Sequence, residues 1–385
     1  MAGGAATHSL MATVAVVGAG PAGASAGYHL ASRGHRVTLF DRAAFPRPKV
    51  CGDWIAEGSV QALADSGLGP DALVRAASEH AVVSGSRVAS PRGETSEVRH
   101  SRRAYCIPRL AFDDILVKRA LRAGCTFERD DVRDLRPGHR GRLDGFDHVI
   151  DARGVYAGRA NCVALRAYWT VEVDGLDPSW AATVHLFADD VFRRGYGWVF
   201  PVAREGTRVR FNLGVGLWKA DGRGPGRNVA AFWEKFVAGN PMVRALEPRA
   251  VERSKAQGHH VAVAEWRNRV AGEGVLRIGD AANLTDPLTG EGIANALRSG
   301  ALAAEAIHGA ADAAEAARTW QRSYETEFAP DLRAALVVRA LLVGTRAKNA
   351  ALWLMKRRPA FAERFHASLA GAHPWRRLLS VRALL

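Results

Sequence analysis

The chain has 385 residues (41.4 kDa), 48% of them hydrophobic and 24% charged, so it is long enough for two or three domains and its composition excludes wholesale disorder. Its net charge of +14 is typical of proteins that bind nucleic acid, an anionic membrane surface or an anionic ligand. The four cysteines have no metal-binding spacing and no apolar run is long enough to cross a bilayer, so the sequence predicts no metal site, reduced thiols and a cytoplasmic protein.

The first predicted unit is a strand, a helix and a second strand. The apolar strand 14–17 runs into three glycines with the spacing G-x-G-x-x-G, which are Gly18, Gly20 and Gly23. A helical pattern follows, and the second strand, 37–40, ends at Asp41. In this order the glycines let the backbone approach a diphosphate at the helix N-terminus, and the acid binds ribose hydroxyls. The unit therefore predicts a dinucleotide-binding domain.

The middle of the chain has a different pattern. A helix is predicted over 110–123, the end of a strand over 148–151, and a further helix over 232–237. Four β-rich stretches follow one another closely: 168–173, 182–187, 196–200 and 208–213. Such a succession of short strands predicts an antiparallel sheet rather than more strand–helix–strand units.

A third unit decides which dinucleotide is expected. The strand 275–278 is followed by Asp280, and a glycine-rich turn with Gly290 and Gly292 then opens a helix that ends near His308. An acid at a strand end can bind ribityl hydroxyls. A turn at a helix N-terminus offers N–H groups and a positive dipole to the electron-rich edge of a flavin. The turn therefore favours FAD.

The last segment is helical and basic. From residue 311 onward the helical pattern is broken at Pro330, Gly344, Pro359 and Pro374. Eleven basic residues against two acidic ones give residues 331–385 a net charge of +9, which leaves +5 for the first 330. Trp353 and Trp375 stand beside basic clusters, so this region suits either an anionic membrane surface or a helical face packed on the body. Since no nucleic-acid motif accompanies the charge, we expect no nucleic-acid partner.

Several segments together carry a resemblance to one group of flavoproteins. They are residues 18–23 with Asp41, 46–52, 107–109 with Phe112 and Asp113, 196–201, 214–216 and 279–293. On these segments the chain resembles the p-hydroxybenzoate-hydroxylase-like flavoprotein superfamily, and within it the geranylgeranyl reductase family. The resemblance covers most of the chain, from residue 14 to residue 308.

The resemblance implies an α/β architecture with three parts. A discontinuous Rossmann-type FAD-binding domain is expected over 1–75, 105–165 and 266–310. An inserted antiparallel β-sheet substrate domain is expected over 76–104 and 166–265, and a helical basic C-terminal region over 311–385.

The resemblance also implies roles for individual residues. The residues that match FAD contacts of the family are Gly18, Gly20, Gly23, Asp41, Arg109 and Asp280. Those that match the turn beside the flavin ring are Pro287, Gly290 and Gly292. Cys51 matches a cysteine near flavin and substrate, and the residues of the substrate tunnel are Tyr196, Trp198, Phe200 and Pro201. Simple packing is the alternative for Cys51, Trp198 and Phe200, and Lys49 is expected on a solvated loop.

The implied function is FAD-dependent reduction of a carbon–carbon double bond in an apolar isoprenoid-like or polycyclic substrate. Hydride from the reduced flavin would reach one alkene carbon, NADPH or NADH would reduce the flavin, and Cys51, with Tyr196 in reserve, would protonate the other carbon. Arg153 stands where related hydroxylases carry Asp, which favours a reductase. The alternatives are a monooxygenase on the same fold and a non-catalytic lipid or pigment carrier. The sequence makes no prediction of the oligomeric state.

Overall fold

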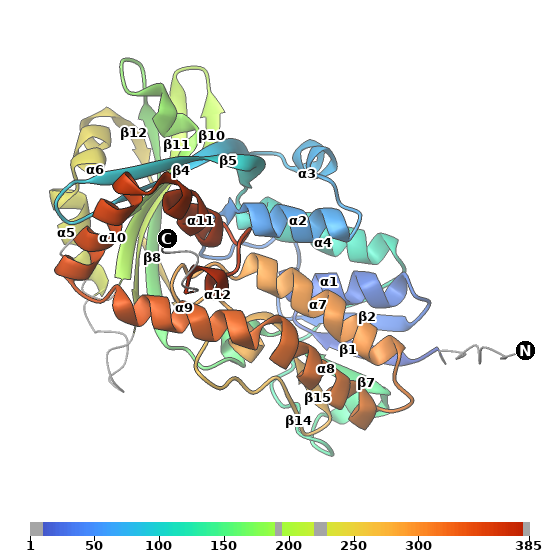
Figure 1. Cartoon of the computed structure of the whole chain (residues 1–385). Helices are drawn as coiled ribbons and strands as arrows, with labels where there is room; N and C mark the ends of the chain where they lie inside the picture. Colours follow the sequence, from blue (N-terminus) through green and yellow to red (C-terminus); the bar gives the residue numbers. More distant parts are fainter. Residues whose placement is uncertain (1–10, 189–194, 219–228, 380–385) are drawn as a thin grey trace, which may run out of the picture.

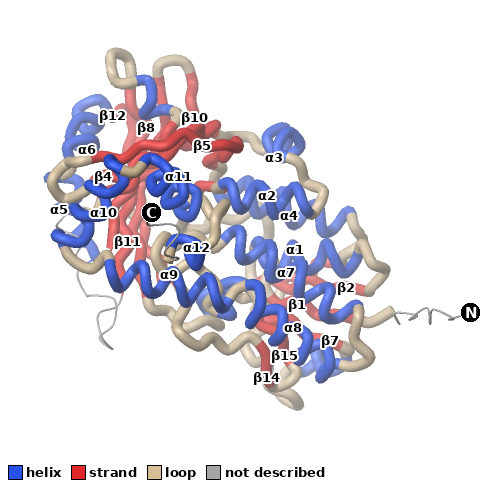
Figure 2. Tube along the Cα trace, viewed as in Figure 1, coloured by secondary structure: helices blue, strands red, loops and turns tan. Residues whose placement is uncertain are grey.

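The structure is a computed structural model and describes residues 11–188, 195–218 and 229–379. Two β-sheets lie side by side, each with its own helices, and the C-terminal helices run across both (Figures 1 and 2). This arrangement confirms the expected α/β architecture with an antiparallel sheet beside a parallel one and a helical C-terminal region. Among the described residues, no helix combines the length and the apolarity that a membrane span requires.

The first sheet is parallel except at one edge. Its six strands, in spatial order, are β14 (Ala271–Gly272), β15 (Val275–Arg277), β7 (His148–Asp151), β1 (Thr13–Val17), β2 (Arg36–Asp41) and β6 (Thr126–Arg129). Only the pairing of β14 with β15 is antiparallel. The carboxyl ends of β1, β2 and β7 therefore lie at the same edge, and the predicted strand–helix–strand unit is confirmed around them.

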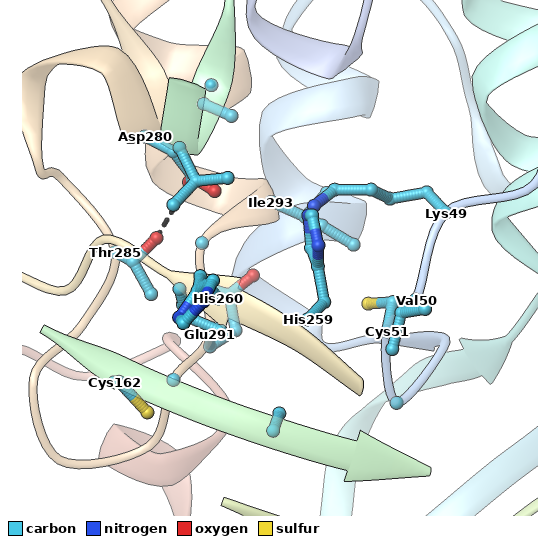
Figure 3. A pocket seen from close by; sticks show the side chains of 18 of the residues that line it. Lys49, Val50, Cys51, Cys162, His259, His260, Asp280, Thr285, Glu291 and Ile293 are labelled. Atoms are coloured by element: carbon cyan, nitrogen blue, oxygen red, sulfur yellow. Dashed lines mark hydrogen bonds between the residues drawn. The ribbon is translucent and has the colours of Figure 1, made fainter. Parts of the chain in front are cut away.

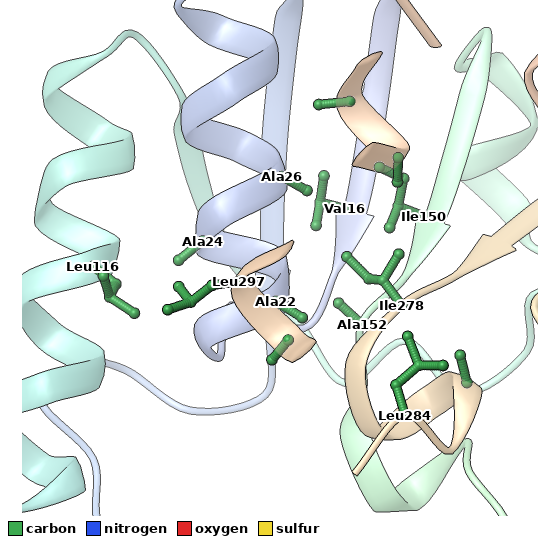
Figure 4. Close-up of a cluster of buried hydrophobic side chains, with 14 of the residues drawn as sticks. Val16, Ala22, Ala24, Ala26, Leu116, Ile150, Ala152, Ile278, Leu284 and Leu297 are labelled. Carbon is green, nitrogen blue, oxygen red and sulfur yellow. The ribbon is translucent and has the colours of Figure 1, made fainter. Parts of the chain in front are cut away.

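Helices cover one face of this sheet. They are α1 (Pro21–Ala31), α2 (Glu57–Asp65), α4 (Arg109–Arg122), α7 (Ile293–His308) and α8 (Ala313–Glu327). Val14 and Val16 of β1 pack into the large core beneath these helices (Figure 4), whereas Ala15 and Val17 pack into a smaller cluster on the other face. This alternation is what a strand buried on both faces requires, and it explains the continuous apolar run in the sequence.

The second sheet has nine strands and is antiparallel apart from the pairing of β4 with β9. Its strands are β12 (Ala250–Arg253), β8 (Cys162–Glu172), β11 (Arg208–Trp218), β10 (Gly195–Glu205), β9 (Thr183–Phe187), β4 (Ala81–Ala89), β5 (Thr95–Cys106) and β3 (Trp54–Ile55) in spatial order, with β13 (Gln257–Val261) also paired to β8. The smaller helices α3 (Pro70–Ala76), α5 (Val229–Gly239) and α6 (Pro241–Leu246) complete the body.

The four predicted strands of this sheet are confirmed; β8, β10 and β11 are longer than predicted, whereas β9 is one residue shorter. The hairpin of β4 and β5 was missed. β5 has the sequence TSEVRHSRRAYC, in which charged residues face solvent over most of its length. A strand with so few apolar residues lacks the alternation that identifies strands in a sequence. The domain bounds predicted from the resemblance stay a prediction.

The C-terminal helices pack on the body. They are α9 (Ala329–Leu341), α10 (Thr345–Arg357), α11 (Pro359–Leu369) and α12 (Trp375–Leu378). Trp375 and Phe365 lie in a buried cluster that also includes Val88 of β4, and the Trp375 indole N–H donates to Asp286 at 2.7 Å. Of the two interpretations of the basic region, packing on the body is therefore correct for Trp375, whereas Trp353 is 48% exposed.

Candidate active site

A cavity of about 1400 Å³ is lined by residues of both sheets and of the C-terminal helices (Figure 3). The predicted site residues that line it are Gly18, Gly20, Asp41, Cys51, Arg109, Tyr196, Trp198, Phe200, Asp280, Gly290 and Gly292. Gly23, Pro287 and Pro201 are not among its described lining residues. Thus the structure brings most of the predicted residues, which are far apart in the sequence, to one space.

The glycine turn after β1 forms one wall of the cavity. Gly18 has φ +102°, and a Cβ there would overlap the backbone of Ala152. A Cβ at Gly23 would overlap the carbonyl oxygen of Gly18, so this third glycine allows α1 to pack against the turn. Gly20, the N-cap of α1, has no side chain that could bond the first turn of the helix, so the N–H groups that follow Pro21 have no side-chain cap. Because these positions are glycines, the turn forms an open cradle at a helix N-terminus, and such a cradle fits a diphosphate.

Asp41 stands at the end of β2, beside this turn. Its Oδ2 accepts from the Ala19 backbone N–H at 2.9 Å, and its Oδ1 accepts from Ala43 N–H at 3.0 Å. The Arg47 guanidinium lies 3.7 Å from the same carboxylate and above Gly20. The acid therefore holds the turn in shape, and Arg47 adds a positive charge where the diphosphate of a dinucleotide would lie.

The second glycine turn lies across the cavity. Asp280 accepts from the Thr285 hydroxyl at 2.7 Å, a contact drawn in Figure 3. Gly290 has φ +70°, and Glu291 accepts from the Ala294 N–H at 2.9 Å, which closes the first turn of α7. The Pro287 carbonyl points to Arg339, from which it accepts at 3.1 Å. Glycine and acid thus face the cavity, as a flavin would require, whereas Pro287 anchors the turn to α9.

Arg109 and Asp113 form a buried ion pair at the start of α4. The guanidinium donates to both carboxylate oxygens, at 2.6 and 2.9 Å, and Arg47 reaches the same carboxylate at 3.3 Å. Burial raises the pKa of the Cys51 thiol, while the Arg109 guanidinium beside it acts in the opposite direction. Because the effect of burial is the larger one, the Cys51 thiol carries its proton at neutral pH, with the Arg109 guanidinium beside its sulfur.

The loop that carries Cys51 approaches the aromatic residues of β10 at Gly52. Of the four cysteines, all in the described part of the chain, Cys51 alone is partly exposed. A Cβ at Gly52 would stand 3.0 Å from the Phe200 ring and 3.6 Å from the Trp198 indole nitrogen. Glycine at this position therefore lets the Cys51 loop reach the aromatic wall.

The aromatic wall is formed by Tyr196, Trp198 and Phe200, which share one face of β10. Gly214 of β11 is paired with Trp198, and a Cβ there would overlap the indole ring. The Tyr196 hydroxyl donates to the Thr289 carbonyl, so this side chain joins the wall to the second glycine turn. Pro201, the next residue of β10, is buried but is not a described lining residue of the cavity.

Lys49 and His259 were not predicted as site residues, yet both line the cavity. Lys49 is half-buried rather than solvated and extends toward His259 (Figure 3). Burial lowers the pKa of Lys49 to about 8, against the opposing effect of Asp280, and burial lowers the pKa of His259 to about 4. The His259 Nε2 atom is buried without a hydrogen-bond partner among the described residues. An orphaned nitrogen beside a cation is what a bound polar group in this cavity would satisfy.

The C-terminal helices close another part of the cavity. The residues that they contribute are Leu336, Arg339, Ala340, Leu342, Val343, Lys348, Phe365 and Leu369. Apart from two cations, this set is apolar. The sequence alone could not show that these residues line a cavity. The inward face of each helix depends on packing against the distant strand β4.

Comparison with known proteins agrees with this geometry. Residues 11–140 match the family described as FAD binding domain. A digeranylgeranylglycerophospholipid reductase of Methanopyrus kandleri is 31% identical over 83% of this chain and 86% of that protein. A menaquinone reductase of Mycobacterium tuberculosis is 30% identical over 80% of this chain and 78% of that protein.

Two solved structures share the fold. A geranylgeranyl bacteriochlorophyll reductase-like protein of Thermoplasma acidophilum has a TM-score of 0.69 and 19% identity, over 97% of this chain and 95% of that one. A flavin-dependent brominase has a TM-score of 0.70 and 19% identity, over 94% of this chain and 93% of that one. At such identity the likeness extends to the fold alone. Together with the sequence relatives and the cradle at α1, these findings show that the chain is an FAD-dependent oxidoreductase that belongs to the geranylgeranyl reductase family.

Proposed function

We propose that this protein reduces a carbon–carbon double bond of an apolar, isoprenoid-like or polycyclic substrate, with Cys51 as the proton donor. The observation that carries the proposal is the place of Cys51. It lies between the aromatic wall and the glycine turns, with a thiol whose pKa burial raises. The names of the relatives, which refer to geranylgeranyl lipids and menaquinone, support an isoprenoid chain as the reducible group.

The residues that would hold FAD are those of the two glycine turns, with Asp41 and Asp280. Bound FAD supplies the hydride for the reduction, and NADPH or NADH is the proposed source of that hydride. Cys51 gives a proton to the second alkene carbon, and the Arg109 guanidinium neutralises the thiolate that remains. The Tyr196 hydroxyl already donates a hydrogen bond to the Thr289 carbonyl, so Tyr196 is the weaker candidate for the acid.

The walls of the cavity suit an apolar chain. Trp198 and Phe200 are each 5% exposed and form a rigid surface, and the C-terminal helices add Leu336, Leu342 and Leu369. A rigid apolar wall holds an alkene in place without offering it hydrogen bonds, and water is excluded from the reacting carbons. The two sheets also support the predicted division into an FAD-binding domain and a substrate domain.

The proposed function is tested with the purified holoenzyme under anaerobic conditions. NADPH or NADH is added with menaquinone or a geranylgeranyl lipid, and flavin absorbance and product mass are followed. We expect a yellow protein that is bleached by the nicotinamide, is reoxidised by substrate, and yields a product with two added hydrogens. Oxygen consumption coupled to an oxygenated product would support a monooxygenase instead, and a colourless protein without FAD would support a carrier.

The C-terminal helices also support contact with an anionic membrane. Leu341 and Val343, at the junction of α9 and α10, are 64% and 42% exposed, and Val343 also lines the cavity. An exposed residue that lines a cavity marks an opening. α10 carries four basic residues and no acidic one; Lys348 is buried and lines the cavity, whereas Arg346, Lys356 and Arg357 are exposed, as is Trp353. We place the membrane contact at this opening, where a lipid substrate would enter directly from the bilayer.

Flotation with vesicles tests this contact. We expect the protein to float with phosphatidylglycerol vesicles, to be released from them by salt, and not to float with phosphatidylcholine vesicles. Leu341→Glu should reduce flotation by about tenfold, which corresponds to about 1.4 kcal/mol. Leu121→Glu, at an exposed leucine of α4, is the matched control and should float like the wild type. Equal flotation of the two variants would place the contact elsewhere.

A further inference from the structure

Behind the aromatic wall lies a buried polar cluster that no predicted role includes. We call Asp53, Tyr168 and Asn212 the Asn212 cluster. Asp53 and Asn212 are 0% exposed, and they come from the Cys51 loop and from β11 respectively. Buried polar side chains are costly unless every hydrogen bond is made, so a fully buried carboxylate and carboxamide side by side need a reason.

Asn212 is bonded on both ends of its carboxamide. Its Nδ2 donates to the Cys51 carbonyl at 2.7 Å and to Asp53 Oδ2 at 2.8 Å. Its Oδ1 accepts from the Trp198 indole N–H at 2.9 Å. One side chain is therefore tied at once to the backbone of Cys51 and to the ring of Trp198.

Asp53 completes the arrangement. It has φ +65°, a left-handed conformation that is unusual outside glycine. Its Oδ2 also accepts from the Tyr168 hydroxyl, and its Oδ1 accepts from the Arg109 backbone N–H at 3.2 Å. A strained backbone at full burial persists because these bonds hold it, and they connect the Cys51 loop to the first turn of α4.

Resting on the proposed role of Cys51, we propose that Asn212 is a positioning residue that fixes the Cys51 loop and the Trp198 ring relative to each other. Gly52 lies against the same indole, and because it has no side chain the loop comes close to the ring. The carboxamide suits this task because it has both a donor and an acceptor. An aspartate would keep the acceptor for Trp198 but would lose the donor to Cys51, and would place a second carboxylate beside Asp53.

The test separates the two ties. In the substrate-free holoenzyme, alkylation of Cys51 by a maleimide is followed by peptide mass spectrometry, with the three buried cysteines as internal references. Asn212→Ala and Asn212→Asp should each raise the alkylation rate of Cys51 by about tenfold, because its carbonyl is released. Trp198→Phe removes the indole N–H and part of the packing against Gly52 but leaves the bond from Asn212 to the Cys51 carbonyl, so it should raise KM and change the alkylation rate less than either Asn212 variant does. In turnover, Asn212→Ala should lower kcat by about tenfold, as expected when a reacting group is misplaced by a fraction of an ångström.

A matched control separates positioning from simple stability. Asn240 is 2% exposed and caps α6 with two backbone hydrogen bonds, and it does not line the cavity. Asn240→Ala should lower the melting temperature but keep wild-type alkylation and kinetics. Wild-type alkylation in both Asn212 variants would overturn the proposal. If Cys51→Ala keeps full turnover, the acid role of Cys51 fails, but the alkylation rates still decide whether Asn212 positions the loop.

Discussion

Replacement of Cys51 by alanine is expected to lower turnover by at least about tenfold while FAD stays bound. General acid catalysis is typically worth about 10² to 10⁴ in rate, and the Cys51 thiol, which lines the cavity, is the proposed proton donor. Burial raises the pKa of this thiol, so the proposed acid would hold its proton when substrate arrives, and Arg109 would stabilise the thiolate that remains. The measurement is kcat with flavin content determined on the same sample.

Two further variants sharpen this result. Cys51→Ser keeps the shape but has a much weaker acid, so it should also be slow. Cys125→Ala removes a cysteine buried in the core beneath the helices and serves as the control, with some loss of stability and wild-type kcat. Unchanged turnover in Cys51→Ala would remove Cys51 from the chemistry and would leave Tyr196 and Lys49, which also line the cavity, as candidates for the proton donor.

Gly18→Ala is expected to abolish FAD binding at working concentrations, with a Kd raised by about a hundredfold or more. Alanine at φ +102° costs roughly 1–2 kcal/mol of backbone strain, and its Cβ would overlap the Ala152 backbone, so the strand end must move. That movement opens the cradle at the N-terminus of α1. The measurement is the flavin-to-protein ratio after purification, followed by titration of the apoprotein with FAD.

The control for this prediction isolates the overlap from the strain. Gly34 also has a positive φ, +86°, but a Cβ there meets no atom within 4 Å. Gly34→Ala should therefore cost some stability and retain FAD. If both variants keep FAD, the turn tolerates a side chain and the diphosphate lies elsewhere; if both lose it, the loss comes from general destabilisation rather than from the cradle.

The residues of the FAD half that could be predicted belong to short continuous motifs. Gly18, Asp41 and Asp280 each follow a buried strand, and the carboxyl ends of neighbouring parallel strands meet at one edge of a sheet. Their role depends on local backbone geometry, which neighbouring residues determine. Alternation also predicted that Trp198 and Phe200 share one face of a strand, whereas their place in a substrate tunnel was implied by the resemblance and stays a prediction.

Residues whose role depends on a distant partner could not be predicted. Lys49 was expected in solvent, because nothing in its own loop shows that β13 covers it. His259 lies in β13, which is polar and short and has no apolar alternation. Asn212 lies in β11 between the apolar residues Phe211 and Leu213, and nothing in that stretch indicates its hydrogen bonds to Cys51 and Trp198, which form only once the loop has docked on the sheet.

The C-terminal region shows the same division. Its helices and its charge of +9 were evident from composition and periodicity, since both are local properties of the chain. Packing on β4 and on the turn before α7 determines the rest. It buries Trp375 against Asp286, and it leaves Val343 at the border of the cavity and Leu341 exposed. Sequence patterns thus predicted the flavin fold, which is confirmed, and the glycine turns that are proposed to hold the cofactor. The shape of the substrate cavity and the setting of Cys51 arise from contacts between segments hundreds of residues apart, which burial and hydrogen bonding select only in the folded chain.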